Sequence, residues 1–172
     1  MKKQKGFSLI ELLIVVAIIL IIAAIAIPNL IRAKMAANEA SAVGSERTIV
    51  TAEISYNGAG WNNGANPPVY QGFSATLLNL GSGGGGVCNP ATSTATCLID
   101  DVLAGGNKSG YTFTYAPVAG VGAGAVVNAG FTANADPQSR QQTGTRSFYV
   151  DETGVIRQNN TKAAAVGDAP IA

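Results

Sequence analysis

The chain has 172 residues, of which 47% are hydrophobic and only 12% are charged, and its formal net charge is +1. This composition is not that of a disordered charged tail, and the net charge does not indicate a basic surface that binds a nucleic acid. Histidine is absent, which removes the commonest general base and the commonest metal ligand. We therefore predict no catalytic residues, no metal site and no cofactor.

An apolar segment begins close to the N-terminus. Between Phe7 and Ile27 only Ser8 and Glu11 are polar. The length of this run matches the roughly 20 residues that a transmembrane helix requires. The sequence therefore predicts a transmembrane helix over residues 7–27.

Basic residues flank the apolar segment on both sides, as Lys2, Lys3 and Lys5 before it and as Arg32 and Lys34 after it. The lysines favour a cytoplasmic N-terminus, which would place the rest of the chain outside, and the two later residues oppose that bias. We expect a single-pass protein of the inner, cytoplasmic membrane with its N-terminus inside.

Three interpretations of this segment compete. A plain signal anchor explains its length and the lysines. A cleaved secretory signal peptide fits the Ala24-Ile25-Ala26 site and would give a mature chain that begins near Ile27. Neither explains Glu11, because a carboxylate within an apolar segment costs about 2.5–3.5 kcal/mol on insertion scales and usually has a function. The remaining alternative is that Glu11 lies near the membrane interface and stays hydrated.

The residues around Glu11 resemble a known processing signal. The sequence GFSLIEL at residues 6–12 has a glycine preceded by basic residues, then an aromatic residue, and then a glutamate before the long apolar run. This pattern resembles the prepilin peptidase signature of the type IV pilin and pseudopilin superfamily. Pro28 resembles the helix-kinking proline of that family, and the resemblance covers about residues 1–55.

The resemblance implies specific roles for the N-terminal residues. Residues 1–6 would be a leader peptide that a membrane peptidase removes by cutting between Gly6 and Phe7, after which it methylates the new amine of Phe7. In this family the glutamate at the position of Glu11 is thought to pair with the terminal amine of a neighbouring subunit during assembly. A pair between Phe7 and Glu11 of the same chain is the competing possibility. Residues 7–27 would then form the filament core.

The function that the resemblance implies is that of a structural subunit of a type IV pilus, which is an extracellular helical filament of identical chains. A pseudopilin of a type II secretion system is the alternative. The partners would be further copies of the chain, the prepilin peptidase and methylase, the pilus or secretion assembly machinery, and membrane lipid. An enzyme with an N-terminal anchor finds no support in the residues, and a secreted adhesin requires the signal-peptide interpretation.

The helical pattern continues beyond Pro28. Ala36, Ala40, Val43, Val50 and Ile54 recur at spacings that place them on one helical stripe. We therefore predict one helix from Phe7 to about Ser55, whose amphipathic second half, residues 28–55, packs this stripe against a small domain. The polar remainder is expected to be a solvated face, with pairing between subunits as the alternative; its members are Arg32, Lys34, Glu39, Glu46, Arg47 and Glu53.

Residues 56–172 predict a globular head rich in β-structure. Strands are expected at 110–115, 126–135 and 147–150, the last forming a hairpin with 155–157, and a short helix or turn within 70–80. The polar tail from Gln158 is expected to be weakly ordered. The fold class is therefore α+β, with a long N-terminal helix packed on a small antiparallel sheet, and it resembles the α/β roll of pilin heads.

Two cysteines, Cys88 and Cys97, lie nine residues apart. In an exported chain such a pair predicts a disulfide, here one that closes a small loop, whereas two free thiols are the alternative. In the pilin family the cysteines frame a long C-terminal loop, so the receptor-binding role of that loop is not carried over. Adjacent acids at 100–101 and 151–152 are expected to serve turns and helix caps rather than calcium.

Overall fold

The computed structural model describes residues 7–62, 68–83, 88–121 and 126–171. Gly6 and the predicted leader, residues 1–6, lie outside the described residues. The chain divides into two compact units, Met1–Lys34 and Met35–Ala172, and each is described by itself.

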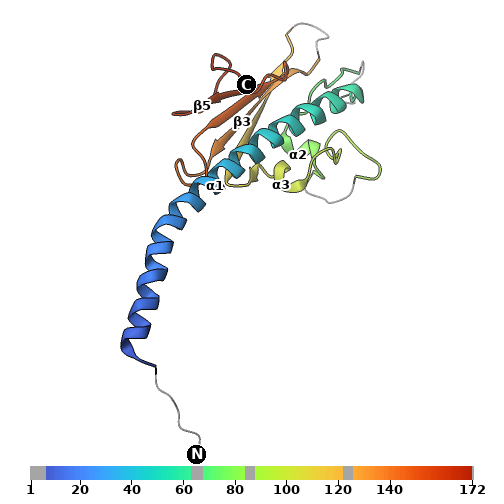
Figure 1. Ribbon diagram of the computed structural model, residues 1–172. Helices are drawn as coiled ribbons and strands as arrows, with labels where there is room; N and C mark the ends of the chain where they lie inside the picture. Colours follow the sequence, from blue (N-terminus) through green and yellow to red (C-terminus); the bar gives the residue numbers. More distant parts are fainter. Residues whose placement is uncertain (1–6, 63–67, 84–87, 122–125, 172) are drawn as a thin grey trace, which may run out of the picture. The chain divides into compact units, whose positions relative to one another are not determined.

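The predicted long helix is confirmed as α1, Leu9–Gly58, which is 50 residues long and contains Pro28 (Figure 1). It ends at a glycine-rich sequence in which Gly60 has a φ of +67°. That left-handed conformation is readily adopted by glycine and stops the helix from continuing.

The first unit contains the apolar part of α1, and its large side chains are uncovered. Every Leu, Ile and Val from Leu9 to Ile27 is exposed. The least exposed of them, Val16, still has 46% of its surface open. Within the described residues this is the one helix long and apolar enough to cross a membrane. A helix that is apolar all round requires a cover of lipid or protein.

The second unit is built on a five-stranded antiparallel sheet in the order β1-β2-β3-β4-β5. Its strands are β1 Asn107–Lys108, β2 Tyr111–Ala119, β3 Asn128–Pro137, β4 Ser147–Asp151 and β5 Arg157–Asn159. The short helices α2, Leu77–Leu80, and α3, Asp101–Ala104, precede the sheet in the chain. The strands expected from sequence are present, whereas β1 and α3 were not predicted. Both are too short to give a periodic pattern.

The core of the head lies between α1 and one face of this sheet (Figure 1). Ile49 and Tyr56 of α1 are fully buried, as are Phe148 and Val150 of β4. The aromatic residues of β2 share one face and belong to this core, as the alternation of residues 111–115 predicts. The α+β arrangement expected from the sequence is therefore confirmed.

The predicted buried stripe of α1 is confirmed only in part. Val43 and Val50 are half-buried and pack against the core, whereas Ala36 and Ala40 are exposed and Ile54 is 62% exposed. The buried face contains three glutamates at seven-residue intervals together with small and aromatic residues; it comprises Glu39, Ala42, Ser45, Glu46, Ile49, Ala52, Glu53 and Tyr56. The prediction that these glutamates lie on a solvated face is wrong, because each is accommodated inside the head in the way described below.

The C-terminal residues, expected to be weakly ordered, fold back on β5. The amide of Gln158 donates to the carbonyl of Ala169 at 2.9 Å, and the amide of Ile171 donates to the carbonyl of Ile156 at 2.9 Å. The carboxylate of Asp168 accepts from the amide of Ala165 at 2.8 Å. These bonds satisfy backbone groups of the tail and so order it. The amino-acid composition of the tail does not predict them.

Candidate functional site

The first turn of α1 holds the residues that the processing signal singles out. Phe7 is 81% exposed. The amide of Ser8 donates to Oε2 of Glu11 at 2.9 Å, and the carbonyl of Ser8 accepts from the amide of Leu12 at 3.3 Å. This is half of a capping box, in which a glutamate at the third helical position bonds to the amide of the cap residue. Glu11 thus stabilises the start of its own helix, and the Ser-x-x-Glu spacing was a sequence signal for it.

Pro28 lies inside α1 and lacks the amide that would donate to the carbonyl of Ala24. Nδ2 of the next residue, Asn29, donates to the carbonyl of Ile25 at 3.1 Å, one residue beyond the carbonyl that lacks its helical donor. The helix nevertheless continues through the proline.

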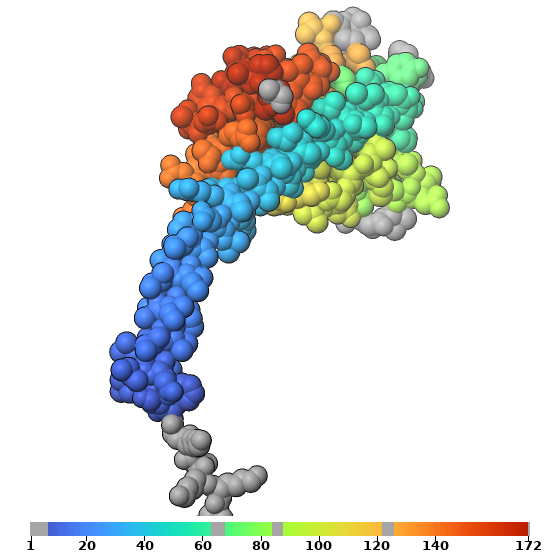
Figure 2. All heavy atoms as spheres, viewed as in Figure 1, coloured from blue at the N-terminus to red at the C-terminus, as the bar shows by residue number. Residues whose placement is uncertain are grey.

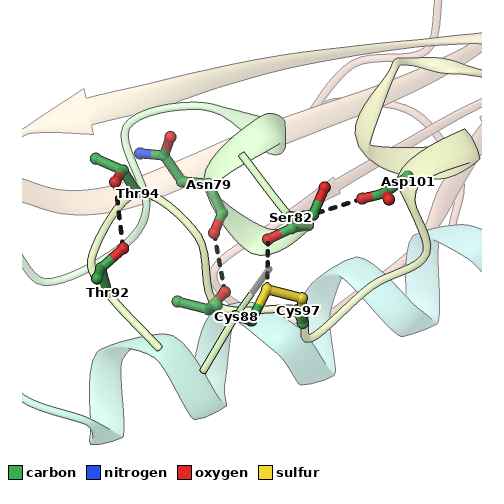
Figure 3. Close-up of a disulfide and its surroundings, with 9 residues drawn as sticks. Asn79, Ser82, Cys88, Thr92, Thr94, Cys97 and Asp101 are labelled. Atoms are coloured by element: carbon green, nitrogen blue, oxygen red, sulfur yellow. Dashed lines mark hydrogen bonds between the residues drawn. A yellow bond between two sulfur atoms is a disulfide. The ribbon is translucent and has the colours of Figure 1, made fainter. Parts of the chain in front are cut away.

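The disulfide between Cys88 and Cys97 is confirmed (Figure 3). The amide of Cys97 donates to the carbonyl of Gly81 at 2.9 Å, and the amide and hydroxyl of Thr96 donate to the carbonyl of Asn79 at 3.1 and 2.9 Å. These bonds hold the end of the disulfide loop against α2.

The same loop also contacts the end of α1. The hydroxyl of Tyr56 donates to Oε1 of Gln71 at 2.7 Å and to the carbonyl of Ser93 at 2.8 Å, two alternative acceptors for one proton. Burial, followed by the negative charge of Glu53, raises the pKa of Tyr56 to about 12. Tyr56 therefore stays protonated and can donate at every physiological pH.

Glu39, the first buried glutamate of α1, has a full set of partners. Its carboxylate accepts from the amides of Thr145 and Arg146 at 2.8 and 3.2 Å, and from Nε of Arg146 at 2.8 Å. Burial opposes the charge, but these hydrogen bonds and the guanidinium outweigh it and lower the pKa of Glu39. Glu39 therefore anchors α1, as an anion, to the segment before β4.

Glu53, the third of these glutamates, is bonded to Ser74. The carboxylate accepts from the amide of Ser74 at 2.9 Å and from its hydroxyl at 2.5 Å, while the hydroxyl of Tyr115 donates to the carbonyl of Ser74 at 3.0 Å. Burial raises the pKa of Glu53 in spite of these bonds. This cluster joins α1 to the segment before α2 and to β2.

Glu46, the middle glutamate, is fully buried, and neither of its carboxyl oxygens has a hydrogen-bond partner in the described part of the chain. Burial, followed by the negative charge of Asp136, raises the pKa of Glu46 to about 8. The group is therefore mostly protonated at neutral pH, because a charge without a partner is too costly inside the head.

One acid of each adjacent pair in the head serves a cap or a turn, as predicted, whereas Oδ1 of Asp101 accepts from the more distant amide of Ser82 at 2.9 Å. Oδ1 of Asp100 accepts from the amide of Leu103 at 3.0 Å and caps α3, while Oδ1 of Asp151 accepts from the amide of Thr153 at 3.0 Å in a turn. Within residues 7–62, 68–83, 88–121 and 126–171, no cluster of three or more His, Cys, Asp or Glu could hold a metal.

The N-terminal region of the chain is similar to a known family. Residues 1–27 match the family described as "Prokaryotic N-terminal methylation motif". Over 54 residues the chain is 52% identical to the type IV wide pilus major component PilA4 of Thermus thermophilus and 46% identical to the type IV major pilin protein PilA of Myxococcus xanthus.

These matches cover 31% of this chain, and 35% and 24% of the two relatives. No solved structure matches the chain. The similarity to these relatives thus covers less than a third of the chain, and the methylation motif matches residues 1–27. The motif and the two relatives together support a type IV pilin.

Proposed function

We propose that this chain is a structural subunit of a type IV pilus and not an enzyme. The observation that carries the proposal is the uncovered apolar part of α1, which lies within the residues that match the methylation motif. Such a helix requires lipid before assembly and protein after it. Both surroundings are apolar, so passage from one to the other needs no large hydrophobic driving force.

In this proposal the chain first stands in the cytoplasmic membrane with its N-terminus inside. The prepilin peptidase cuts between Gly6 and Phe7 and methylates the new amine, and the assembly machinery then moves the subunit into an extracellular filament. The relatives named above are major pilins, which supports this role over that of a type II secretion pseudopilin.

In this proposal Glu11 sets the register between neighbouring subunits of the filament. Its carboxylate is the only one in the apolar segment, and the cut creates an ammonium group on Phe7. In an apolar surrounding this pair attracts strongly, and either charge left alone is costly. In this proposal the bond from the Ser8 amide to Glu11 would hold the carboxylate until the ammonium of a neighbouring subunit reaches it.

Mass spectrometry of the N-terminal peptide tests the proposal, with sheared filaments and cell membranes analysed separately. We expect a peptide that begins at methylated Phe7 in the sheared filaments. The same peptide confined to membranes would favour the pseudopilin, and a chain that begins near Ile27 would contradict the motif-based assignment.

A further inference from the structure

A hollow of about 390 Å³ lies at the end of the head where α1 stops. This apical hollow is lined by Asn57 of α1, by Gly60 just after it, and by Tyr70, Gly72 and Val126. In Figure 2 the green end of α1 and the yellow-orange tip of β2 and β3 lie at the same end of the head. The volume falls within the range of small-molecule sites, roughly 300–1,000 Å³.

The described lining of the apical hollow carries no charge. The chain has no Asp, Glu, Lys or Arg in residues 54–99 or in residues 109–135, and these two segments supply every described residue of the lining. A phosphate, a carboxylate or a cation would lose its hydration here without gaining an ion pair. The lining therefore selects a neutral ligand.

Tyr70 is the main feature of this lining. Of the aromatic side chains in the described head, only that of Tyr70 is exposed, with 65% of its surface open, whereas the others are buried or half-buried. An aromatic ring offers an apolar face for contact, and the hydroxyl of tyrosine adds a polar end. Tyr70 thus gives the hollow a contact surface that the core of the head does not use.

The backbone holds Tyr70 in a fixed position. The carbonyl of Tyr70 accepts from the amide of Val127 at 2.9 Å, which joins its segment to the residues before β3. Gly72 has a φ of +71°, and a Cβ at this position would collide with the carbonyl oxygen of Asn128. Glycine is therefore needed for this close approach. Because the segment is already ordered, a ligand binds without a large cost in conformational entropy.

Two polar side-chain ends are available in the hollow. The amide of Asn57 and the hydroxyl of Tyr70 form no hydrogen bond with any of the residues that the structure describes. Each group both donates and accepts. The ring of Tyr70 and the side chain of Val126 supply apolar contact beside them. The lining therefore combines an apolar face with hydrogen-bonding groups of both kinds.

We propose that the apical hollow binds a short neutral saccharide. One face of a pyranose ring consists of C–H groups, which pack on an aromatic ring, and its rim carries hydroxyl groups that donate and accept hydrogen bonds. This pattern matches the ring of Tyr70 beside the amide of Asn57, whereas a purely apolar ligand would leave the polar groups without partners. The volume suits about one or two sugar rings.

The inference goes beyond the proposed filament function and does not depend on it, because the hollow belongs to the head of a single chain. Binding is therefore measured on the full chain in a polyoxyethylene detergent, since a glycoside detergent would itself compete. The neutral probes are cellobiose, maltose and diacetylchitobiose, and digalacturonate is the anionic counterpart. We expect at least one neutral probe to bind and digalacturonate to bind at least about tenfold more weakly than it.

Two readouts follow the titration. Calorimetry gives the dissociation constant. The emission of Trp61, the single tryptophan of the chain, reports on the site because the carbonyl of Trp61 accepts from the amide of Gln71 at 2.8 Å, next to Tyr70. We expect the emission to change with the same dissociation constant that calorimetry gives.

Matched substitutions test the role of Tyr70. Tyr70→Ala should weaken binding by about tenfold, because the stacking surface is lost. Tyr70→Phe keeps the ring and loses one hydroxyl, so it should weaken binding by about threefold. Val102→Ala is the control, because Val102 is 61% exposed on α3 and does not line the hollow. The thermal midpoint of all three variants should stay close to that of the unmodified chain, since both residues are exposed.

Several results would overturn the proposal. They are the absence of binding to every neutral probe, tighter binding of digalacturonate, and an affinity that Tyr70→Ala leaves unchanged. None of these results affects the filament function, which is tested by the N-terminal peptide of sheared filaments. Conversely, a chain that forms no filaments but binds a neutral disaccharide through Tyr70 would disprove the filament function and leave the saccharide site in place.

Discussion

The guanidinium of Arg146 donates to the carboxylate of Glu39 at 2.8 Å and so joins α1 to the start of β4 across more than one hundred residues of sequence. The guanidinium side chain is 42% exposed, whereas the carboxylate side chain is only 10% exposed. The two partners therefore contribute unequally to the free energy of unfolding. A buried acceptor that loses its donors destabilises the fold more than an exposed cation that loses its acceptor.

This asymmetry predicts the effects of two substitutions. Glu39→Ala should lower the free energy of unfolding by about 2 kcal/mol, since the amides of Thr145 and Arg146 lose their acceptor together with the guanidinium. Arg146→Met should cost about 1 kcal/mol, because both backbone bonds to Glu39 remain and the lost ion pair is partly solvated. Denaturant titration of the solubilised chain measures both, and equal losses would contradict the assigned roles.

Glu46 predicts a loss of stability on the alkaline side. Its pKa rises from the usual 4.5 to about 8 on folding, so the folded chain binds the proton more tightly than the unfolded chain. Its contribution is fully present below about pH 4.5 and is lost as the pH rises through about 8. Unfolding titrations between pH 5 and pH 9, about the range set by these values, should show a decrease of the order of a few kcal/mol.

Glu46→Gln is the control, because glutamine has the same shape and does not ionise. The variant should lose most of this decline and be the more stable chain above about pH 8. Glu39 acts in the opposite direction, since its lowered pKa gives stability that is lost as the pH falls below the ordinary glutamate value. An unchanged alkaline decline in Glu46→Gln would assign the effect to another group.

The disulfide predicts a local loss of order. Replacing Cys88 and Cys97 by serine opens a loop whose ends are nine residues apart, which should cost about 2–3 kcal/mol on a chain-entropy estimate. The amides of Thr96 and Cys97 should exchange faster with solvent, because their bonds to Asn79 and Gly81 depend on the closed loop. Hydrogen exchange that accelerates equally in β3 and β4 would show that the disulfide holds the whole head.

Glu11→Ala predicts separate effects on processing and on assembly. The peptidase signal retains Gly6 and Phe7, so membrane insertion and cleavage should persist. Filament yield or subunit order should fall, because the Phe7 ammonium loses its partner. Ser8→Ala is the control; the bond to Glu11 comes from the backbone amide of residue 8, which alanine retains. Filaments of normal yield and register from Glu11→Ala would rule out the pairing.

Much of the fold followed from local patterns. The apolar run after Phe7 predicts a helix by composition alone, and the alternation at Tyr111–Tyr115 predicts a strand with one buried face. The close spacing of Cys88 and Cys97 predicts a disulfide once export is assumed. Each of these depends on neighbours in the sequence, so no knowledge of the tertiary contacts was needed.

The buried face of α1 could not be obtained in this way. Periodicity assigns apolar residues to the core and charged residues to water, which selects Ala36 and Ala40 and rejects Glu39, Glu46 and Glu53. Whether a glutamate can be buried depends on donors supplied by distant segments, here Arg146 for Glu39 and Ser74 for Glu53.

The sequence by itself determined the N-terminal motif, the apolar helix and the class of the head, because these rest on short-range pattern and composition. Only the tertiary structure decided which side of α1 faces the sheet and which side remains open. The physical reason is that a helix has two competing faces, and the choice between them depends on partners more than one hundred residues away, such as Arg146 for Glu39.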